Sequence, residues 1–159
     1  MGRNMVKRLY NTTEDRIIFI DNLLVGKHPS EWLPQEKTGN IEDIEIFGDD
    51  HRLFFIKDDF RNLLKKMTED DRYLQKTYGF EFDKFSDVFH FAAIVGGRAV
   101  IDGDPMMVAQ DLAIDAEFFY WICRHKPGRA LYPSSSAAYP INLQTESHSI
   151  ALSESDIDF

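Results

Sequence analysis

Short apolar runs along the chain are separated by charged and turn-forming residues. Residues 16–20 (RIIFI), 53–57 (LFFIK) and 88–91 (VFHF) are rich in β-branched and aromatic side chains, and residues 130–133 (ALYP) form a further run. Runs of this length and composition predict strands, and their continuous apolar character is typical of parallel strands buried on both faces. The pattern therefore predicts four strands, with helices between them.

Apolar residues at helical spacing predict three helices, over residues 2–12, 60–67 and 104–125. In the third helix, Asp104 can cap the first turn, and residues 126–128 (KPG) stop the helix. The inward stripe of this helix is predicted to consist of Val108, Leu112, Ala116, Phe119 and Cys123.

The remaining segments have weaker patterns. Residues 23–50 predict a long polar connection with one helical turn at residues 30–33. Residues 68–84 predict the end of the second helix, a turn at Gly79 and the approach to the third strand. Residues 141–159 are polar and show no clear periodicity.

Composition and charge narrow the range of partners. The 159 residues suffice for one domain with a core, and the net charge of -9 disfavours nucleic acid and anionic membranes, which need a positive field. A nucleotide ligand is still compatible with this negative charge, because backbone amides can bind phosphates even on an acidic protein. No apolar run is long enough to span a membrane, and the five histidines show no metal-site spacing. The single cysteine, Cys123, is predicted to be a core residue rather than a nucleophile. We therefore expect a cytoplasmic protein that binds no nucleic acid, membrane or metal.

Residues 87–140 predict the part of the fold that would hold a ligand. A strand, a helix and a strand follow one another, so both strands end at one edge of a parallel sheet. Small residues follow each strand, at 92–97 (AAIVGG) and 134–138 (SSSAA). They would let a flat ligand approach the backbone, and the serine hydroxyls would lie where that ligand reacts.

Two acidic residues directly follow predicted strands, and each has two interpretations. Asp21 can accept hydrogen bonds from an adenosine ribose, as acids in dinucleotide-binding folds do, or it can open a turn. Gly2 precedes Asp21 by nearly the ~20 residues that separate such an acid from a glycine-rich turn, so Gly2 could be the last glycine of that turn. Asp59 can accept from an adenine amino group, cap the helix that follows, or do both.

Taken together, these motifs resemble the extended short-chain dehydrogenase/reductases, which are the NAD-dependent epimerases and dehydratases of nucleotide sugars. The resemblance covers nearly the whole chain in the family's order, and part of it looks most like the branch that acts on GDP-sugars. It rests on four motifs: Asp21-Asn22 after RIIFI, Asp59 followed by Arg61, VFHFAA at residues 88–93, and SSSAAYP at residues 134–140.

The resemblance implies which residues would bind NAD. Asp21 and Asn22 would hold the adenosine ribose, and Asp59 and Phe60 would line the adenine pocket. Gly2 would close the glycine-rich turn. The cofactor's phosphates and nicotinamide ribose would pass close to Ala92, Ala93 and Ile94.

The resemblance also implies a reaction. Ser135, or alternatively Ser136, would donate a hydrogen bond to a sugar oxygen while a tyrosinate removes the sugar's proton and hydride passes to NAD. The resulting ketone acidifies the neighbouring carbons and permits epimerisation or elimination. Gly96 and Gly97 would border the nucleotide-sugar substrate.

The chain departs from the family in ways that affect activity. Family members carry a tyrosine followed four positions later by a lysine, whose ammonium lowers the pKa of the phenol, and no Tyr-x-x-x-Lys occurs here. Ala137 stands where the GDP-sugar branch has an acid/base cysteine, and Asp111 replaces a common asparagine. We therefore expect a partial NAD-binding domain over residues 1–159. Its fold would be α/β, a Rossmann-like parallel sheet with flanking helices, lacking the first strand, the C-terminal part and the substrate domain, and inactive by itself.

Lack of the first strand should affect stability. In the family's sheet that strand is central, so its loss removes burial equivalent to about five aliphatic side chains, at roughly 1.5–3 kcal/mol each. The whole net stability of a domain is only about 5–15 kcal/mol. We therefore expect the chain to be marginally stable alone, or to fill the gap with another strand or another copy as a homo-oligomer.

Two other interpretations stay open. The chain could be a non-catalytic remnant, or a nucleotide-binding or interaction module built on half of this fold. It could also be another parallel α/β protein with a serine-rich turn, since fold analogy alone does not establish chemistry.

Overall fold

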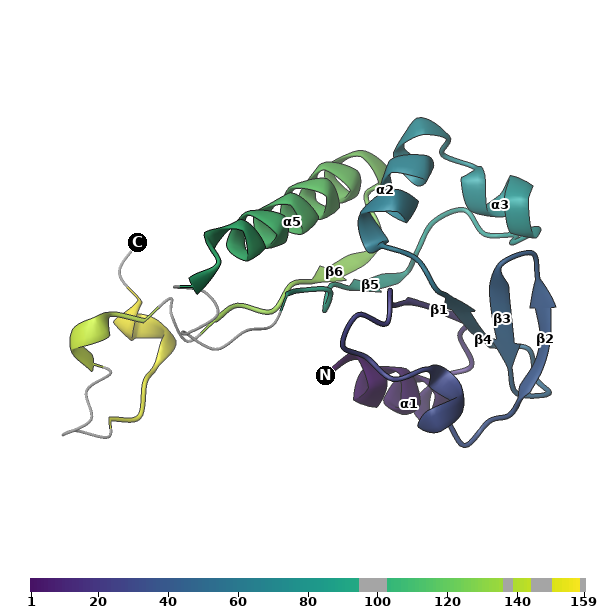
Figure 1. Cartoon of the computed structure of the whole chain (residues 1–159), viewed down its shortest axis with the longest axis horizontal. Helices are drawn as coiled ribbons and strands as arrows, with labels where there is room; N and C mark the ends of the chain where they lie inside the picture. Colours follow the sequence, from purple (N-terminus) through teal and green to yellow (C-terminus); the bar gives the residue numbers. More distant parts are fainter. Residues whose placement is uncertain (95–102, 136–138, 144–149, 158–159) are drawn as a thin grey trace.

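The structure, a computed structural model, describes residues 1–94, 103–135, 139–143 and 150–157. These residues form a mixed α/β fold with helices on both sides of the strands (Figure 1). The helices are α1 (Gly2–Thr12), α2 (Phe60–Glu69), α3 (Tyr73–Tyr78) and α5 (Pro105–His125). The strands are β1 (Ile17–Ile20), β2 (Lys37–Ile41), β3 (Ile44–Phe47), β4 (Leu53–Ile56), β5 (Asp87–Phe89) and β6 (Arg129–Leu131). The 3-10 turns are η1 (Pro29–Glu31), η3 (Ile141–Leu143) and η4 (Glu154–Asp156).

Most predicted elements are confirmed. The first helix has the predicted bounds, and β1, β4 and β5 lie within or at the edge of the predicted apolar runs. The side chain of Asp104 caps α5 by accepting from the Met106 N–H at 3.1 Å. At the other end of α5, Lys126 adopts a left-handed conformation (φ 44°), and the proline that follows it prevents continuation of the helix.

Four strands form one mixed sheet in the order β1-β4-β3-β2. Strands β1 and β4 are parallel, with Ile17 opposite Leu53, whereas β3 is antiparallel to both β4 and β2. Strands β5 and β6 form a second, two-stranded parallel sheet. The predicted α/β class is confirmed, and the β1–β4 and β5–β6 pairs are parallel as predicted. The prediction of a parallel sheet is wrong for β3, which is antiparallel to both neighbours and makes the main sheet mixed, and the described strands form two sheets.

The β2–β3 hairpin lies in residues 23–50, where the sequence predicted only a polar connection. Strand β3 fills the core, since Ile44 and Phe47 are fully buried. Strand β2 (KTGNI) is largely exposed at the sheet edge, which explains why its sequence carries no apolar run. Glu42 takes a left-handed conformation (φ 52°) in the two-residue turn, which suits the twist of a hairpin.

Two apolar clusters lie on opposite faces of the four-stranded sheet. One contains Val6 of α1 packed on the Ile17, Leu53 and Phe55 side chains. The other gathers residues of α2, α3 and α5 on the opposite face, around Phe54. Figure 1 shows the same layers, with α1 on one side of the sheet and α2 and α5 on the other.

The predicted inward face of α5 is wrong. Leu112 is 66% exposed and Phe119 is 43% exposed, whereas Phe118 and Trp121 are buried in the cluster that α5 shares with α2. Ala116 and Cys123, which were predicted to be inside, are also exposed. The helix is apolar on both sides, so its spacing alone could not identify the side that packs. Residue 108 belongs to the same predicted stripe, but its side chain is not described.

Strands β1 and β5 each pair on one side only among the described residues. The Ile17 N–H donates to the Arg52 carbonyl just before β4, and the Asp21 N–H donates to the Ile56 carbonyl at the end of β4. Because amides alternate along a strand, those of Ile18 and Ile20 face the outer edge of β1. Ile18, Ile20 and Val88 all pack against the same apolar cluster, which places β1 and β5 on one core. No described strand occupies the gap predicted beside residues 16–20, and the predicted marginal stability stays a prediction.

Candidate functional site

His90 directly follows β5 and is the buried polar residue of the described core, with 3% of its surface exposed. Its Nε2 lies 2.9 Å from Oδ1 of Asp115 on α5. The other carboxylate oxygen, Oδ2, accepts from the Tyr132 hydroxyl, just after β6, at 2.7 Å. Asp115 therefore joins the ends of the two parallel strands through one carboxylate.

Aromatic rings surround the His90 imidazole. The ring of Phe118 stacks on it at 4.4 Å between centroids, and those of Phe60 and Tyr132 lie at 5.5 Å. Phe60 begins α2 directly after β4 and Asp59. The residues that follow β5 and β6 thus meet at His90, as predicted for these two strands, and Phe60 adds the end of β4, which the sequence did not predict.

The hydrogen bonds of this cluster determine its chemistry. An ionised carboxylate only accepts, so Nε2 of His90 is the donor in its hydrogen bond to Asp115. The buried Nδ1 has no hydrogen-bond partner among the described residues. The hydrogen bond to Asp115, with burial and the charges of Asp115 and Asp111, raises the pKa of the Tyr132 phenol. Tyr132 is therefore held as a protonated donor, which is the opposite of the tyrosinate that proton abstraction requires.

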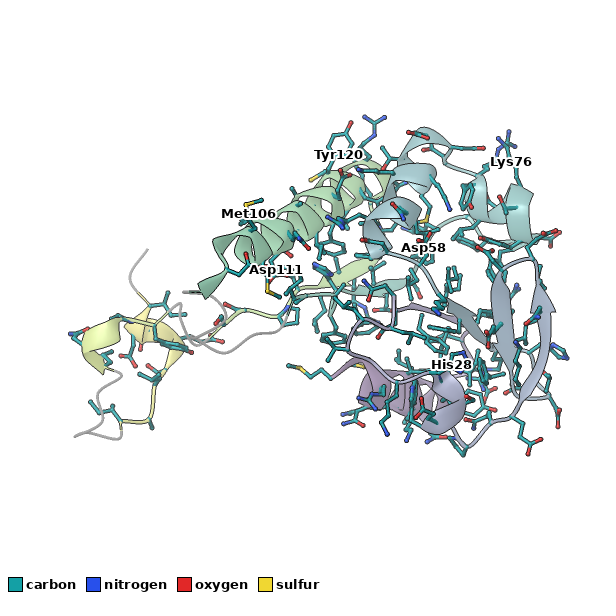
Figure 2. All side chains as sticks on the ribbon, viewed as in Figure 1. His28, Asp58, Lys76, Met106, Asp111 and Tyr120 are labelled. Carbon is teal, nitrogen blue, oxygen red and sulfur yellow. The ribbon has the colours of Figure 1, made fainter. Side chains whose placement is uncertain are left out.

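A second acid of α5 holds the chain beyond β5. The backbone N–H of Ile94 donates to Oδ1 of Asp111 at 2.6 Å. Figure 2 shows Asp111 on the side of α5 that faces the extension of β5 and β6. Ala92 and Ile94 are half-buried, and Ala93 is exposed. The predicted cofactor-contact residues therefore lie on a segment that Asp111 positions.

Asp21 and Asn22 are exposed at the end of β1, and both form local turns. Oδ1 of Asp21 accepts from the Leu23 N–H at 2.7 Å, and the Asn22 side chain accepts from the Leu24 N–H at 3.0 Å. A side chain at Gly26 would come within 2.8 Å of Oδ2 of Asp21, so the loop folds back closely over this carboxylate. The turn-forming role of Asp21 is confirmed, and its ribose-binding role stays a prediction.

Asp59 has the capping role that the sequence allowed. Its Oδ1 accepts from the Arg61 N–H at 2.9 Å at the start of α2. The Arg61 guanidinium also contacts both carboxylate oxygens, with the closest pair 2.6 Å apart. This hydrogen bonding lowers the pKa of Asp59 despite partial burial. Phe60 is half-buried and its ring faces His90, whereas the adenine-binding role of Asp59 and Phe60 stays a prediction.

Replacing Arg61 by methionine should raise the pKa of Asp59 toward its ordinary value while keeping the backbone cap. A carboxyl with a lowered pKa adds stability above about pH 4, its unfolded value, and loses that stability as pH falls through the folded value. We expect the variant to lose less than about 1 kcal/mol at pH 7, because the pair is partly exposed, and progressively less as pH falls through the folded pKa of Asp59. NMR titration of the carboxyl would measure this, and an unchanged Asp59 pKa would contradict it.

The structure describes two of the remaining predicted site residues, Gly2 and Ser135. Gly2 is the first residue of α1, with open space where a side chain would lie. Ser135 is exposed and follows β6 by four residues, at the same end as Ala92 because β5 and β6 are parallel. Gly96, Gly97 and Ser136 lie outside the described residues. No contact places Gly2 or Asp21 against the His90 cluster.

Two cavities among the described residues lie away from this site. The larger measures about 330 Å³ and is lined by Lys7, Tyr10 and Trp32, beside α1 and η1. The other is smaller. It measures about 50 Å³ and is lined by Gln75, Phe85, Trp121 and His125, near the start of β5. Ligand pockets usually measure roughly 300–1,000 Å³, so this space suits water rather than a dinucleotide. The described residues also bring together no group of three His, Cys, Asp or Glu side chains suited to a metal ion.

Sequence reasoning missed the His90, Asp115 and Tyr132 cluster. A histidine inside an otherwise apolar strand end was the one available signal, since such a buried group needs a polar partner. The partner, Asp115, lies 25 residues further along the chain, and only the fold brings it to His90.

No protein-family model, curated protein or solved structure matches this chain. Within the part of the chain that the structure describes, no helix combines the length and apolar character needed to cross a membrane.

Proposed function

We propose that this chain is the central part of an NAD-dependent nucleotide-sugar epimerase or dehydratase with an incomplete Rossmann-like domain. The proposal rests on the arrangement of residues at the carboxyl ends of β5 and β6. Two parallel strands end together, one in Ala92-Ala93 and the other in the serine motif that contains Ser135. Parallel strands whose carboxyl ends carry small and hydroxyl-bearing residues are where α/β folds bind nucleotides.

The parallel β1–β4 pair supports the cofactor side of the proposal. Each of these strands ends in an acid, Asp21 after β1 and Asp59 after β4. Contact between Phe60 and His90 joins the end of β4 to the end of β5. An NAD molecule lying across these ends would have its adenosine near the two acids and its nicotinamide ribose near Ala92 and Ala93.

The proposed reaction begins with oxidation of a sugar hydroxyl. NAD accepts the hydride when it is bound, and Ser135 or Ser136 donates a hydrogen bond to the sugar oxygen. Within these 159 residues no Tyr-x-x-x-Lys supplies the base. Tyr132 is a poor substitute, because Asp115 raises the pKa of its phenol. We therefore expect no turnover from this chain alone, and binding rather than activity is the property to measure.

Replacing Asp21 by alanine should weaken NAD binding by at least about tenfold, equivalent to roughly 1.4 kcal/mol. Two lost hydrogen bonds to the ribose hydroxyls would account for a loss of this size. Isothermal titration calorimetry of the chain with NAD would measure the effect. Asp15→Ala is the matched control, because Asp15 is exposed at the opposite end of β1 and the charge change is the same. Equal binding by wild type and Asp21→Ala would show that the assignment of Asp21 is wrong.

A second candidate is a non-catalytic nucleotide-binding or interaction module built on the same half fold. Its supporting observation is that the carboxylates of Asp21 and Asp59 already have partners in their own loops. The two candidates differ on whether the coding sequence continues into a Tyr-x-x-x-Lys helix. Failure of the wild-type chain to bind NAD would also favour the second candidate.

A further inference from the structure

The outer face of α5 is apolar and uncovered. Its stripe consists of seven residues, none of them charged and all of them exposed: Ala109, Leu112, Ala113, Ala116, Phe119, Tyr120 and Cys123. These positions recur every three or four residues, so they form one continuous face along the helix. An exposed, continuous apolar face is the usual mark of a docking surface.

The rest of the fold packs on the opposite side of α5. Phe118 and Trp121 are buried, and α2, β5 and β6 supply their neighbours. Figure 2 shows Met106 and Tyr120 projecting from α5 away from the strands, while Asp111 projects toward them. Tyr132, just after β6, lies 5.1 Å from Phe119 at one edge of the stripe, measured between ring centroids. Apart from this contact, no helix or strand among the described residues packs on the seven-residue stripe.

The stripe is symmetric about Ala116. Positions 112 and 120 lie four residues to either side of it, positions 113 and 119 lie three, and positions 109 and 123 lie seven. The amino-terminal half carries mostly alanine, and the carboxyl-terminal half carries Phe119 and Tyr120. When two such helices cross antiparallel at Ala116, Phe119 meets the small Ala113 of the other copy, and Tyr120 meets the aliphatic Leu112.

We propose that a second copy of this chain docks on this stripe, with the two α5 helices antiparallel and Ala116 on the two-fold axis. The proposal does not rest on the proposed function. A two-fold interface must be self-complementary, and here every stripe position meets an uncharged stripe position of the other copy. Antiparallel helices also oppose their dipoles and bring Lys126, at the end of one α5, near the capping Asp104 of the other copy.

Among the surfaces that a second copy could use, the charge pattern favours this face. The chain has a net charge of -9, so two copies repel each other over most of their surfaces. The stripe carries no acidic residue, and Arg124 beside it lies over the Tyr120 ring. A single helix pair buries less than the roughly 800 Å² per partner of a standard interface, so we expect a micromolar dissociation constant.

Disulfide trapping tests the position of the axis. With Cys123 replaced by serine, Ala116→Cys should form a cross-linked dimer under mild oxidation, because a residue on the axis faces its own copy within disulfide reach. The matched control is Gln110→Cys in the same background, which is exposed on α5 but lies outside the stripe. Equal cross-linking of both variants, or none in Ala116→Cys, would overturn the proposal.

Sedimentation equilibrium tests the interface itself. At about 100 µM, a concentration above a micromolar dissociation constant, the wild-type chain should be mostly dimeric, and Ala116→Arg should weaken association at least tenfold. Gln110→Arg should leave association unchanged. Both positions are exposed, so matching circular dichroism spectra would show that the fold is kept. A monomeric wild type, or a dimer that Ala116→Arg leaves intact, would contradict the proposal.

Discussion

Replacing Phe118 by alanine is expected to lower the free energy of unfolding by about 3–5 kcal/mol, the range for a large aromatic residue lost from a core. Phe118 has no exposed surface. Its ring stacks on His90 at 4.4 Å and lies 6.2 Å from Phe60. The substitution would leave a cavity between α5 and α2, next to a buried imidazole. Urea denaturation followed by circular dichroism would measure the loss.

The neighbouring Phe119→Ala variant is the matched control. It removes the same side chain from the same helix, but Phe119 is 43% exposed, so a loss below about 1 kcal/mol is expected. The comparison should be made at low protein concentration, where the proposed dimer is dissociated. Equal losses in the two variants would show that α5 packs by a different face.

Replacing Gly128 by alanine is expected to cost about 1–3 kcal/mol through overpacking. A side chain at this position would come within 2.5 Å of the Ser86 carbonyl oxygen, and that oxygen already accepts from the Arg129 N–H at 2.8 Å. The clash involves backbone at the start of the β5–β6 pair, so no side-chain rotation relieves it. Thermal unfolding monitored by circular dichroism would report the cost.

Gly39→Ala in β2 provides the comparison for Gly128. Open space surrounds the position where its side chain would lie. Alanine there should be neutral or slightly stabilising, because glycine loses more conformational freedom on folding. If both variants unfold at the wild-type temperature, Gly128 does not lie as close to the Ser86 carbonyl as the structure shows.

Local sequence signals predicted the elements that are buried on both faces. Strand β1 reads IIFI and β4 reads LFFI, and both lie at positions where helices cover the sheet above and below. Short continuous apolar runs rich in β-branched and aromatic residues are typical of such strands, which is why these two strands were predicted. The β2–β3 hairpin was missed because the edge strand β2 is polar, with Lys37 and Asn40 exposed, and because Glu45 interrupts the short apolar sequence of β3.

The packing face of α5 could not be read from spacing. Phe118 and Phe119 are adjacent, both aromatic, and point to different sides of the helix. Each belongs to an apolar stripe, and only the position of α2 decides which stripe is inside. The same ambiguity concealed Asp115, which looks like a solvent-facing acid until β5 brings His90 to it.

The outer edges of β1 and β5, which no described strand pairs, link folding to concentration. An extended segment from any chain that pairs there binds the folded form and not the unfolded one. By mass action, such a segment present at a hundred times its dissociation constant would add about 2.7 kcal/mol to the free energy of unfolding. The thermal midpoint of this protein would then depend on the amount of that segment in solution as well as on the chain's own contacts.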